Sequence, residues 1–428
     1  MCIRDRDKDV KSRIDLKIVG GRGDDTFNIK GRAKNFIFDI KDSGNYLLSR
    51  SKTHLRFSND PMVNNFDWIE YKYAIQRFPR ILLGYNVDDG VLLGIGIVRR
   101  TFGFRKDPFA TDNRFGILYA PQRGAYSIRY KGEFTQLISI YDLVLKADLL
   151  NPALHNFFGL GNNTEIDPTK DPSFYLARYK YFTVEALLRK RFFSSFSISA
   201  GPVFYHYWIE RSDNVEKILE NPSLAFIDSL SVYSKKSFVG GKILADINTL
   251  NDELFPTRGI HWTHEFTALG GLTKHTGNLI RYSTDMEVYS SLSAPAKLVS
   301  VIRLGYGHIF NKDFEYFNAL NLGANNFLRG FRKNRFSGNT LAYGSLELRV
   351  KLFDSRWYIM PGQFGLIGFN DVGRVWLRGE DSKRWHYTYG GGIYYVPFNL
   401  LIVSATFGFS KEEQLLNFSV GTKLNITF

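Results

Sequence analysis

The residues that could do chemistry in this chain are few, and their spacing favours structure over catalysis. The segment His261-Trp262-Thr263-His264-Glu265 holds two imidazoles and a carboxylate, which on a helix could bind zinc. The segment alternates like a β-strand, however, and there a spacing of three residues places His261 and His264 on opposite faces. The single cysteine, Cys2, excludes an internal disulfide and a cysteine-based zinc site. We therefore expect no metal site.

Enzyme motifs are also missing from the sequence. It contains no Gly-x-Ser-x-Gly elbow, no phosphate-binding loop and no Gly-x-Gly-x-x-Gly after a predicted strand. His54, His155 and His386 lie in different parts of the chain, without an evident partner. We expect no catalytic residue and no cofactor within these 428 residues. The function should therefore depend on the strands and loops rather than on a chemical step.

The composition is typical of a membrane barrel. Aromatic residues (6 Trp, 24 Tyr and 37 Phe) make up 16% of the chain, and such rings favour the two water–lipid interfaces. The longest apolar stretch, at 91–98, is interrupted by glycine and is far shorter than the ~20 residues of a spanning helix. The net charge of +14 comes from scattered basic residues rather than a basic stripe, which argues against a nucleic-acid partner.

A two-residue periodicity decides the fold class. In the segment 343–352, Leu346, Leu348 and Val350 alternate with Glu347 and Arg349. The segments 401–410 and 415–428 alternate in the same way, so each has one apolar and one polar face. A soluble sandwich would also alternate. Charged polar faces and segments much longer than the usual ~5–6 residues of a strand favour a barrel with lipid outside.

The number of alternating segments predicts an all-β, 16-stranded antiparallel transmembrane barrel over residues 78–428, because bacterial barrels have an even number of strands. Long connections at 149–172, 209–236 and 311–339 alternate with tight turns, and we expect the long ones to be extracellular. The predicted strands cover residues 80–87, 90–101, 114–120, 125–134, 137–148, 173–191, 195–208, 237–249, 259–271, 278–294, 297–310, 340–353, 362–378, 386–397, 399–410 and 415–428.

Residues 1–77 do not follow this pattern. They form a short β-rich N-terminal segment, and their first residues are charged and lack the apolar core of a secretory signal peptide. Because an outer-membrane barrel must first cross the inner membrane, we interpret this segment as the remnant of a truncated upstream domain.

The segment 326–339 (NFLRGFRKNRFSGN) resembles the Omp85 superfamily, the bacterial surface-antigen or BamA/TamA-like barrels that insert or translocate proteins at the outer membrane. That family carries an Arg-Gly-Phe/Tyr motif in a long loop folded into the lumen, matched here by Arg329, Gly330 and Phe331. The resemblance covers about residues 78–428. Further family-like pieces, in the family's order, are FGLGNN at 158–163, FPTRG at 255–259, GSLEL at 344–348 and FNDVGRVW at 369–376.

The resemblance implies that Arg329 pairs with Glu347, with Asp371 on the next strand in support. The planar guanidinium suits a two-pronged bond to a carboxylate, and Glu347 lies on the polar face of its strand. Gly330 would allow close approach, and Phe331 would pack at the loop tip.

Two further sites follow from the strand pattern and the resemblance. The last residues resemble the family's insertion signal, a glycine followed by spaced apolar residues and a terminal aromatic: Gly421, Leu424, Ile426 and Phe428. The first strand is short and contains a glycine after a proline, so we expect its junction with the last strand to be the weakest. This lateral seam would involve Ile81, Gly84, Tyr85 and Phe418, and would open toward lipid as in the family.

Two functions remain open from the sequence. The first is protein insertion or translocation by an integral barrel of the bacterial outer membrane. Its partners would be the bilayer, lipopolysaccharide, the assembly machinery and a client protein. Family insertases carry docking domains before the barrel, and residues 1–77 show no helix pair to build one. The second is the membrane anchor or export barrel of a larger enzyme with a calcineurin-like phosphoesterase domain upstream.

Overall fold

The computed structural model divides the chain into two compact units, Met1–Lys72 and Tyr73–Phe428. The second unit begins a few residues before the boundary expected from the sequence. The structure describes residues 15–20, 25–29, 34–41, 46–49, 53–58, 61–64, 75–86, 90–103, 106–221, 232–252, 254–274, 276–324, 327–356, 358, 360–398 and 401–422.

The first unit is built from short parallel strands. Strands β1 (Asp15–Val19), β3 (Lys34–Ile40) and β5 (Thr53–Ser58) form one sheet. Strands β2 (Thr26–Ile29) and β4 (Tyr46–Ser49) form a second. Alternate residues of β3 are buried, and Ile37 packs with Phe27 and Ile29 in a small core. Each strand therefore pairs with the next but one along the chain.

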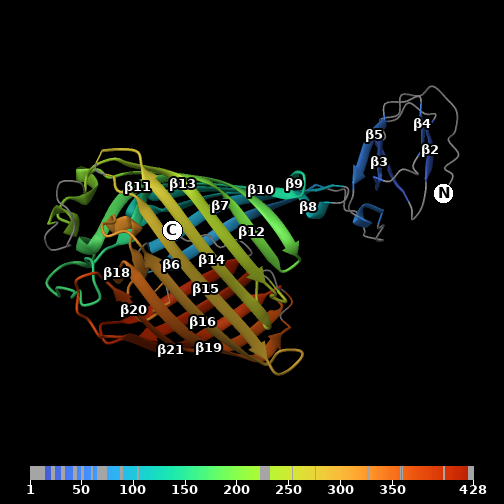
Figure 1. Ribbon diagram of the computed structural model, residues 1–428. Helices are drawn as coiled ribbons and strands as arrows, with labels where there is room; N and C mark the ends of the chain where they lie inside the picture. Colours follow the sequence, from blue (N-terminus) through green and yellow to red (C-terminus); the bar gives the residue numbers. More distant parts are fainter. Residues whose placement is uncertain are drawn as a thin grey trace. The chain divides into compact units, whose positions relative to one another are not determined.

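The second unit is a barrel of sixteen antiparallel strands, each paired with its neighbour in sequence (Figure 1). No described helix is long and apolar enough to cross a membrane. The strands are β6 (Gln76–Asn86), β7 (Gly90–Gly103), β8 (Lys106–Ala120), β9 (Ala125–Ile138), β10 (Tyr141–Asn156), β11 (Leu176–Phe193), β12 (Phe196–Trp208), β13 (Lys236–Asn248), β14 (Gly259–Gly271), β15 (Leu279–Ser291), β16 (Leu298–Ile309), β19 (Thr340–Ser355), β20 (Gly362–Trp376), β21 (His386–Pro397), β22 (Leu401–Phe409) and β23 (Gln414–Thr422).

The structure confirms the predicted number and order of strands, but several strands are longer than predicted, among them β8 and β10. Strand β8 begins at Lys106 rather than near 114, although residues 107–113 lack an alternating apolar face. Asp112 in that stretch is buried and forms ion pairs with Arg100 and Arg114. These ion pairs replace the apolar contacts by which the other strands were recognised. Strand β10 continues past the predicted end at 148, because a register shift between Leu150 and Ala153 accommodates Pro152.

Side chains alternate across the barrel wall as the sequence predicts. On β19, Leu346, Leu348 and Val350 are 47%, 44% and 39% exposed on the outer surface. Ser345 and Arg349, in the opposite phase, are only 7% and 9% exposed. Because water-filled or polar lumens and apolar outer faces are characteristic of membrane barrels, this phase places lipid outside the wall.

The loop between β16 and β19 is folded into the lumen. It contains a short turn of 3-10 helix, η6 (Tyr316–Asn318), and a two-stranded hairpin of β17 (Leu320–Leu322) and β18 (Phe336–Gly338). Its apolar residues join the barrel's inward side chains in one buried cluster. The ring of Phe317 stacks on Tyr207 of β12 at 3.7 Å between centroids, and the hydroxyls of Tyr207 and Tyr316 lie 2.6 Å apart. The loop is therefore part of the core of the barrel.

Candidate functional site

The Arg-Gly-Phe segment of the lumen loop lies against two neighbouring strands of the wall. Arg329 donates from Nε to Asp371 Oδ2 at 3.0 Å and from Nη2 to Asp371 Oδ1 at 2.7 Å, a two-pronged bond to β20. Its Nη1 donates to Glu347 on β19, and its Nη2 also donates to Ser345 at 3.1 Å. The guanidinium lies over the ring of Phe369, 3.6 Å from the centroid. One arginine thus joins the loop to β19 and β20.

The carboxylates around Arg329 are well compensated. Asp371 is fully buried, and it also accepts hydrogen bonds from Ser345 at 2.7 Å and Thr388 at 3.1 Å. Glu347 accepts a second charged bond from Arg349 at 2.7 Å. Burial of the guanidinium opposes its charge, but the hydrogen bonds to Asp371 and the charge of Glu347 raise the pKa of Arg329. The group stays ionised and can do no acid–base chemistry, so its arrangement is suited to holding the loop.

Gly330 and Phe331 fix the loop from the other side. A Cβ on Gly330 would lie 2.7 Å from the backbone of Phe409 on β22, a contact that only glycine permits. Phe331 is 2% exposed and meets Phe336 and His386 edge-on, at 5.2 Å and 5.7 Å between centroids. The segment is therefore packed between β19–β20 and β22.

The wall closes between β23 and β6 through a single registered pair among the described residues, Phe418 with Tyr85. By contrast, β23 pairs with β22 from Thr422 to Gln414, and β6 pairs with β7 from Gln76 to Asn86. Ile81 and Gly84 pair only with β7 in the part of the chain that the structure covers. The four seam residues therefore lie on two adjacent strands, with little ladder between them.

The insertion-signal residues are placed in part. Gly421 pairs with Ile402 at the end of β23. Leu424, Ile426 and Phe428 lie outside the described residues.

The two histidines of the zinc-like segment have separate partners. His261 bonds to Asp246 on β13 at 3.0 Å, whereas His264 bonds to the Tyr282 hydroxyl on β15 at 2.8 Å. Within the described ranges, no group of three or more His, Cys, Asp or Glu side chains could hold a metal ion.

Sequence reasoning missed several residues that fix the loop. Arg332 pairs with Glu413 at 2.9 Å and Arg335 with Glu412 at 2.7 Å, both in the turn between β22 and β23. No local pattern in the sequence indicates these partners, because the two pairs are separated by 81 and 77 residues.

The family-like segment 158–163 also has a structural role. The backbone N–H groups of Asn162 and Asn163 donate to Glu380 between β20 and β21, each at 2.9 Å to Oε1. The Asn162 side chain donates to Ser382 at 2.9 Å. Two loops that are far apart in sequence are thereby tied together at the same end of the barrel as the lumen loop.

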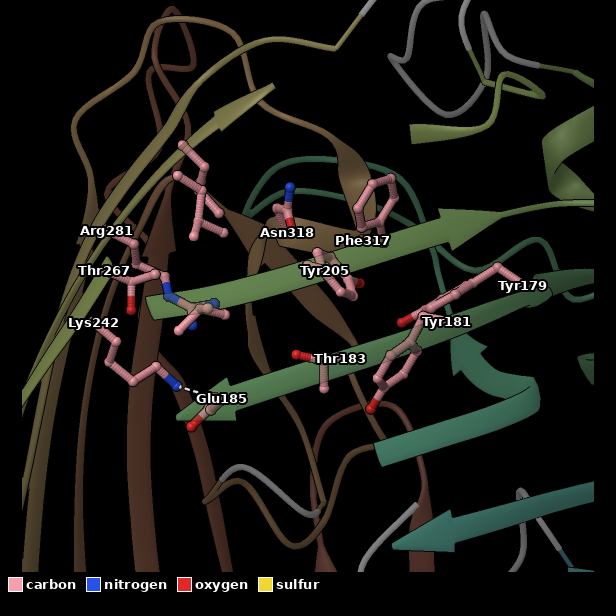
Figure 2. Close-up of a pocket in the computed structure, with 13 residues that line it drawn as sticks. Tyr179, Tyr181, Thr183, Glu185, Tyr205, Lys242, Thr267, Arg281, Phe317 and Asn318 are labelled. Atoms are coloured by element: carbon pink, nitrogen blue, oxygen red, sulfur yellow. Dashed lines mark hydrogen bonds and ion pairs between the residues drawn. The ribbon is translucent and has the colours of Figure 1, made fainter. Parts of the chain in front are cut away.

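A cavity of about 260 Å³ lies in the lumen between β11–β15 and the loop residues Phe317 and Asn318. Figure 2 shows Tyr179 and Tyr181 toward one end of it and the ion pair of Lys242 with Glu185 toward the other. The lumen beside the loop is therefore polar and only partly filled by side chains.

Comparisons with known proteins identify the fold and the family. No curated protein sequence matches the chain significantly. The structure of BamA from Haemophilus ducreyi lacking POTRA domains 1-3 is similar, with a TM-score of 0.55 and 14% identity over 90% of this chain and 73% of that one. CdiB from Acinetobacter baumannii gives 0.51 and 14% over 81% of this chain, and CdiB from Escherichia coli 0.53 and 12% over 89%.

The chain spans 59% and 66% of the two CdiB chains, and at these identities the likeness shows the fold. The model of the Omp85 superfamily domain matches residues 156–425, which is well over half of the chain and includes the lumen loop. The chain belongs to the Omp85 superfamily.

Proposed function

We propose that this protein is an integral barrel of the bacterial outer membrane that inserts or translocates polypeptides through the seam between β6 and β23. Membership of the Omp85 superfamily and the likeness to BamA and CdiB barrels support this function. The observation that carries it is that, among the described residues, one registered pair joins β6 and β23. An unpaired strand edge is a template on which an extended polypeptide can add by backbone hydrogen bonds.

The remaining site residues take roles within this function. Arg329 with Glu347 and Asp371 braces the lumen loop, and Gly330 and Phe331 seat it against β22. The assembly machinery recognises the barrel by a C-terminal signal that consists of Gly421, Leu424, Ile426 and Phe428. The protein acts by binding rather than by a chemical step, with the bilayer, lipopolysaccharide, the assembly machinery and a client protein as partners. The long loops face the cell exterior.

A disulfide across the seam tests the proposal. Tyr85 and Phe418 are Cα partners, so cysteines at both positions meet the spacing that a disulfide needs. In a Cys2→Ser background, we expect the oxidised Y85C/F418C barrel to lose insertion of a β-barrel client into liposomes, and a reductant to restore it. The matched control is V403C/V420C, which joins the already paired β22 and β23. Full activity of the oxidised seam variant would contradict the proposal.

A further inference from the structure

Two arginines of the lumen loop, which connects β16 to β19, bind the turn between β22 and β23. Arg332 Nε donates to Glu413 Oε1 at 2.9 Å. Arg335 binds Glu412 with two bonds, from Nε at 2.7 Å and from Nη2 at 2.9 Å. The partners are separated by 81 and 77 residues of sequence, so these bonds join two distant segments. Together they tie residues 332–335 to the turn 410–413.

Arg335 is held more firmly than a surface ion pair. Its side chain is fully buried, and its guanidinium lies between the rings of Phe158 and Phe336, 4.9 Å and 4.6 Å from their centroids. Its Nη1 and Nη2 also donate to the hydroxyl and carbonyl oxygens of Thr164, at 2.7 Å and 2.6 Å. Four hydrogen bonds therefore hold the guanidinium, which fixes the direction from which it binds Glu412.

The backbone of the loop also lies directly on this hairpin. A Cβ on Gly408 of β22 would come within 2.6 Å of the Arg329 carbonyl oxygen, so the two backbones are in close contact. The Asn417 side chain on β23 donates to the same carbonyl at 2.9 Å. Asn417 directly precedes Phe418, the described seam residue. The loop thus contacts β23 one residue away from the seam.

We propose that Arg332 and Arg335 position the β22–β23 hairpin and thereby hold the seam closed. The side chain of Arg329 fixes the loop to β19 and β20, while Arg332, Arg335 and the Arg329 carbonyl fix the hairpin to the loop. Without the two glutamate contacts, the turn 410–413 loses its charged bonds to the loop and keeps the packing of Gly330 against Phe409. The hairpin then moves away from β6 more readily, because one registered pair among the described residues opposes that motion.

The test measures the seam in the folded barrel without a client. In the Cys2→Ser, Y85C/F418C background, we expect E412Q/E413Q to lower the rate of disulfide formation about tenfold, equivalent to about 1.4 kcal/mol in seam closure. R335K should act in the same direction, because lysine keeps the charge but loses the fork. The matched control K411Q changes an exposed residue of the same turn and should leave the rate unchanged.

A charge exchange guards against a purely structural effect. R332E combined with E413R should restore most of the rate that R332E alone loses, and heat-modified gel migration should show that each barrel is folded. Unchanged rates in folded E412Q/E413Q and R335K would overturn the proposal. Equal loss in R332E and in the exchanged pair would also overturn it.

The importance of these arginine–glutamate contacts for transport rests on the proposed function. The disulfide test of the contacts needs no client and does not depend on that function. If the oxidised seam variant inserts clients normally while the glutamate variants alter disulfide formation, the proposed function fails and the positioning role stands. If the oxidised seam variant loses insertion while the glutamate variants leave disulfide formation unchanged, the proposed function stands and the positioning role fails.

Discussion

At the scale of single residues, Arg329 connects two parts of the barrel wall. Its guanidinium contacts β19 and β20, while its carbonyl oxygen accepts from Asn417 on β23. The first contacts come from the side chain and the last from the backbone, so a substitution of the side chain leaves the carbonyl contact in place. The side chain, however, neutralises two carboxylates that have little water around them.

We therefore expect Arg329→Ala to destabilise the barrel by about 3–5 kcal/mol, the usual cost of leaving a buried charge without its partner. The measurement is guanidinium unfolding of the purified barrel, followed by tryptophan fluorescence. Arg378→Ala is the control, because that residue is exposed and its bond to Asn339 comes from the backbone N–H, which the substitution keeps. Similar losses in both variants would show that the contact with Glu347 and Asp371 is unimportant.

At the scale of elements, alternation identified the strands because lipid and lumen select opposite side chains at every second position. The same rule failed for residues 107–113 and 149–156, where ion pairs and a register shift maintain the ladder without an apolar face. The short hairpin of β17 and β18 was missed for a related reason. It lies inside the barrel, where both of its faces are covered.

The candidate site was predictable only in part. Arg329, Glu347 and Asp371 could be named because they fall in family-like motifs. Arg332 and Arg335 could not be matched to Glu412 and Glu413 by any local pattern. Such a pairing depends on how a 30-residue loop returns through the lumen, and sequence spacing carries no information about that path.

The facing of β19 gives a direct test at this scale. Leu348 is exposed near the middle of the strand, and Leu348→Arg should cost about 2–4 kcal/mol in a bilayer. The cost comes from placing a charge in the apolar region of lipid. Folding into liposomes at increasing urea concentrations measures it, with Leu348→Ala as the control for lost packing. Wild-type stability of the arginine variant would contradict the assigned outer face.

At the scale of the whole molecule, the chain consists of two units with separate cores. The barrel unit begins at Tyr73, and its first strand begins at Gln76. Strand pairing in the barrel involves none of β1 to β5. Residues 73–428 therefore contain all the strands that form the barrel.

We expect a chain of residues 73–428 to fold into the same barrel in detergent or liposomes. The reason is that each unit has its own sheets and its own buried residues. Circular dichroism and heat-modified gel migration, compared with those of the full chain, provide the measurement. Failure of the shorter chain to fold, under conditions in which the full chain does, would show that the first unit is required.

The sparse ladder between β6 and β23 has an energetic consequence. Along most of their described length, β6 and β23 have no registered pair with each other, although each pairs fully with its other neighbour. Backbone donors and acceptors on the facing edges therefore lack a ladder partner there. In hydrocarbon, each unsatisfied backbone group costs several kcal/mol, far more than in water. In the proposed function, an extended client that aligns with this edge satisfies these groups, so we expect its addition to lower the free energy of the edge.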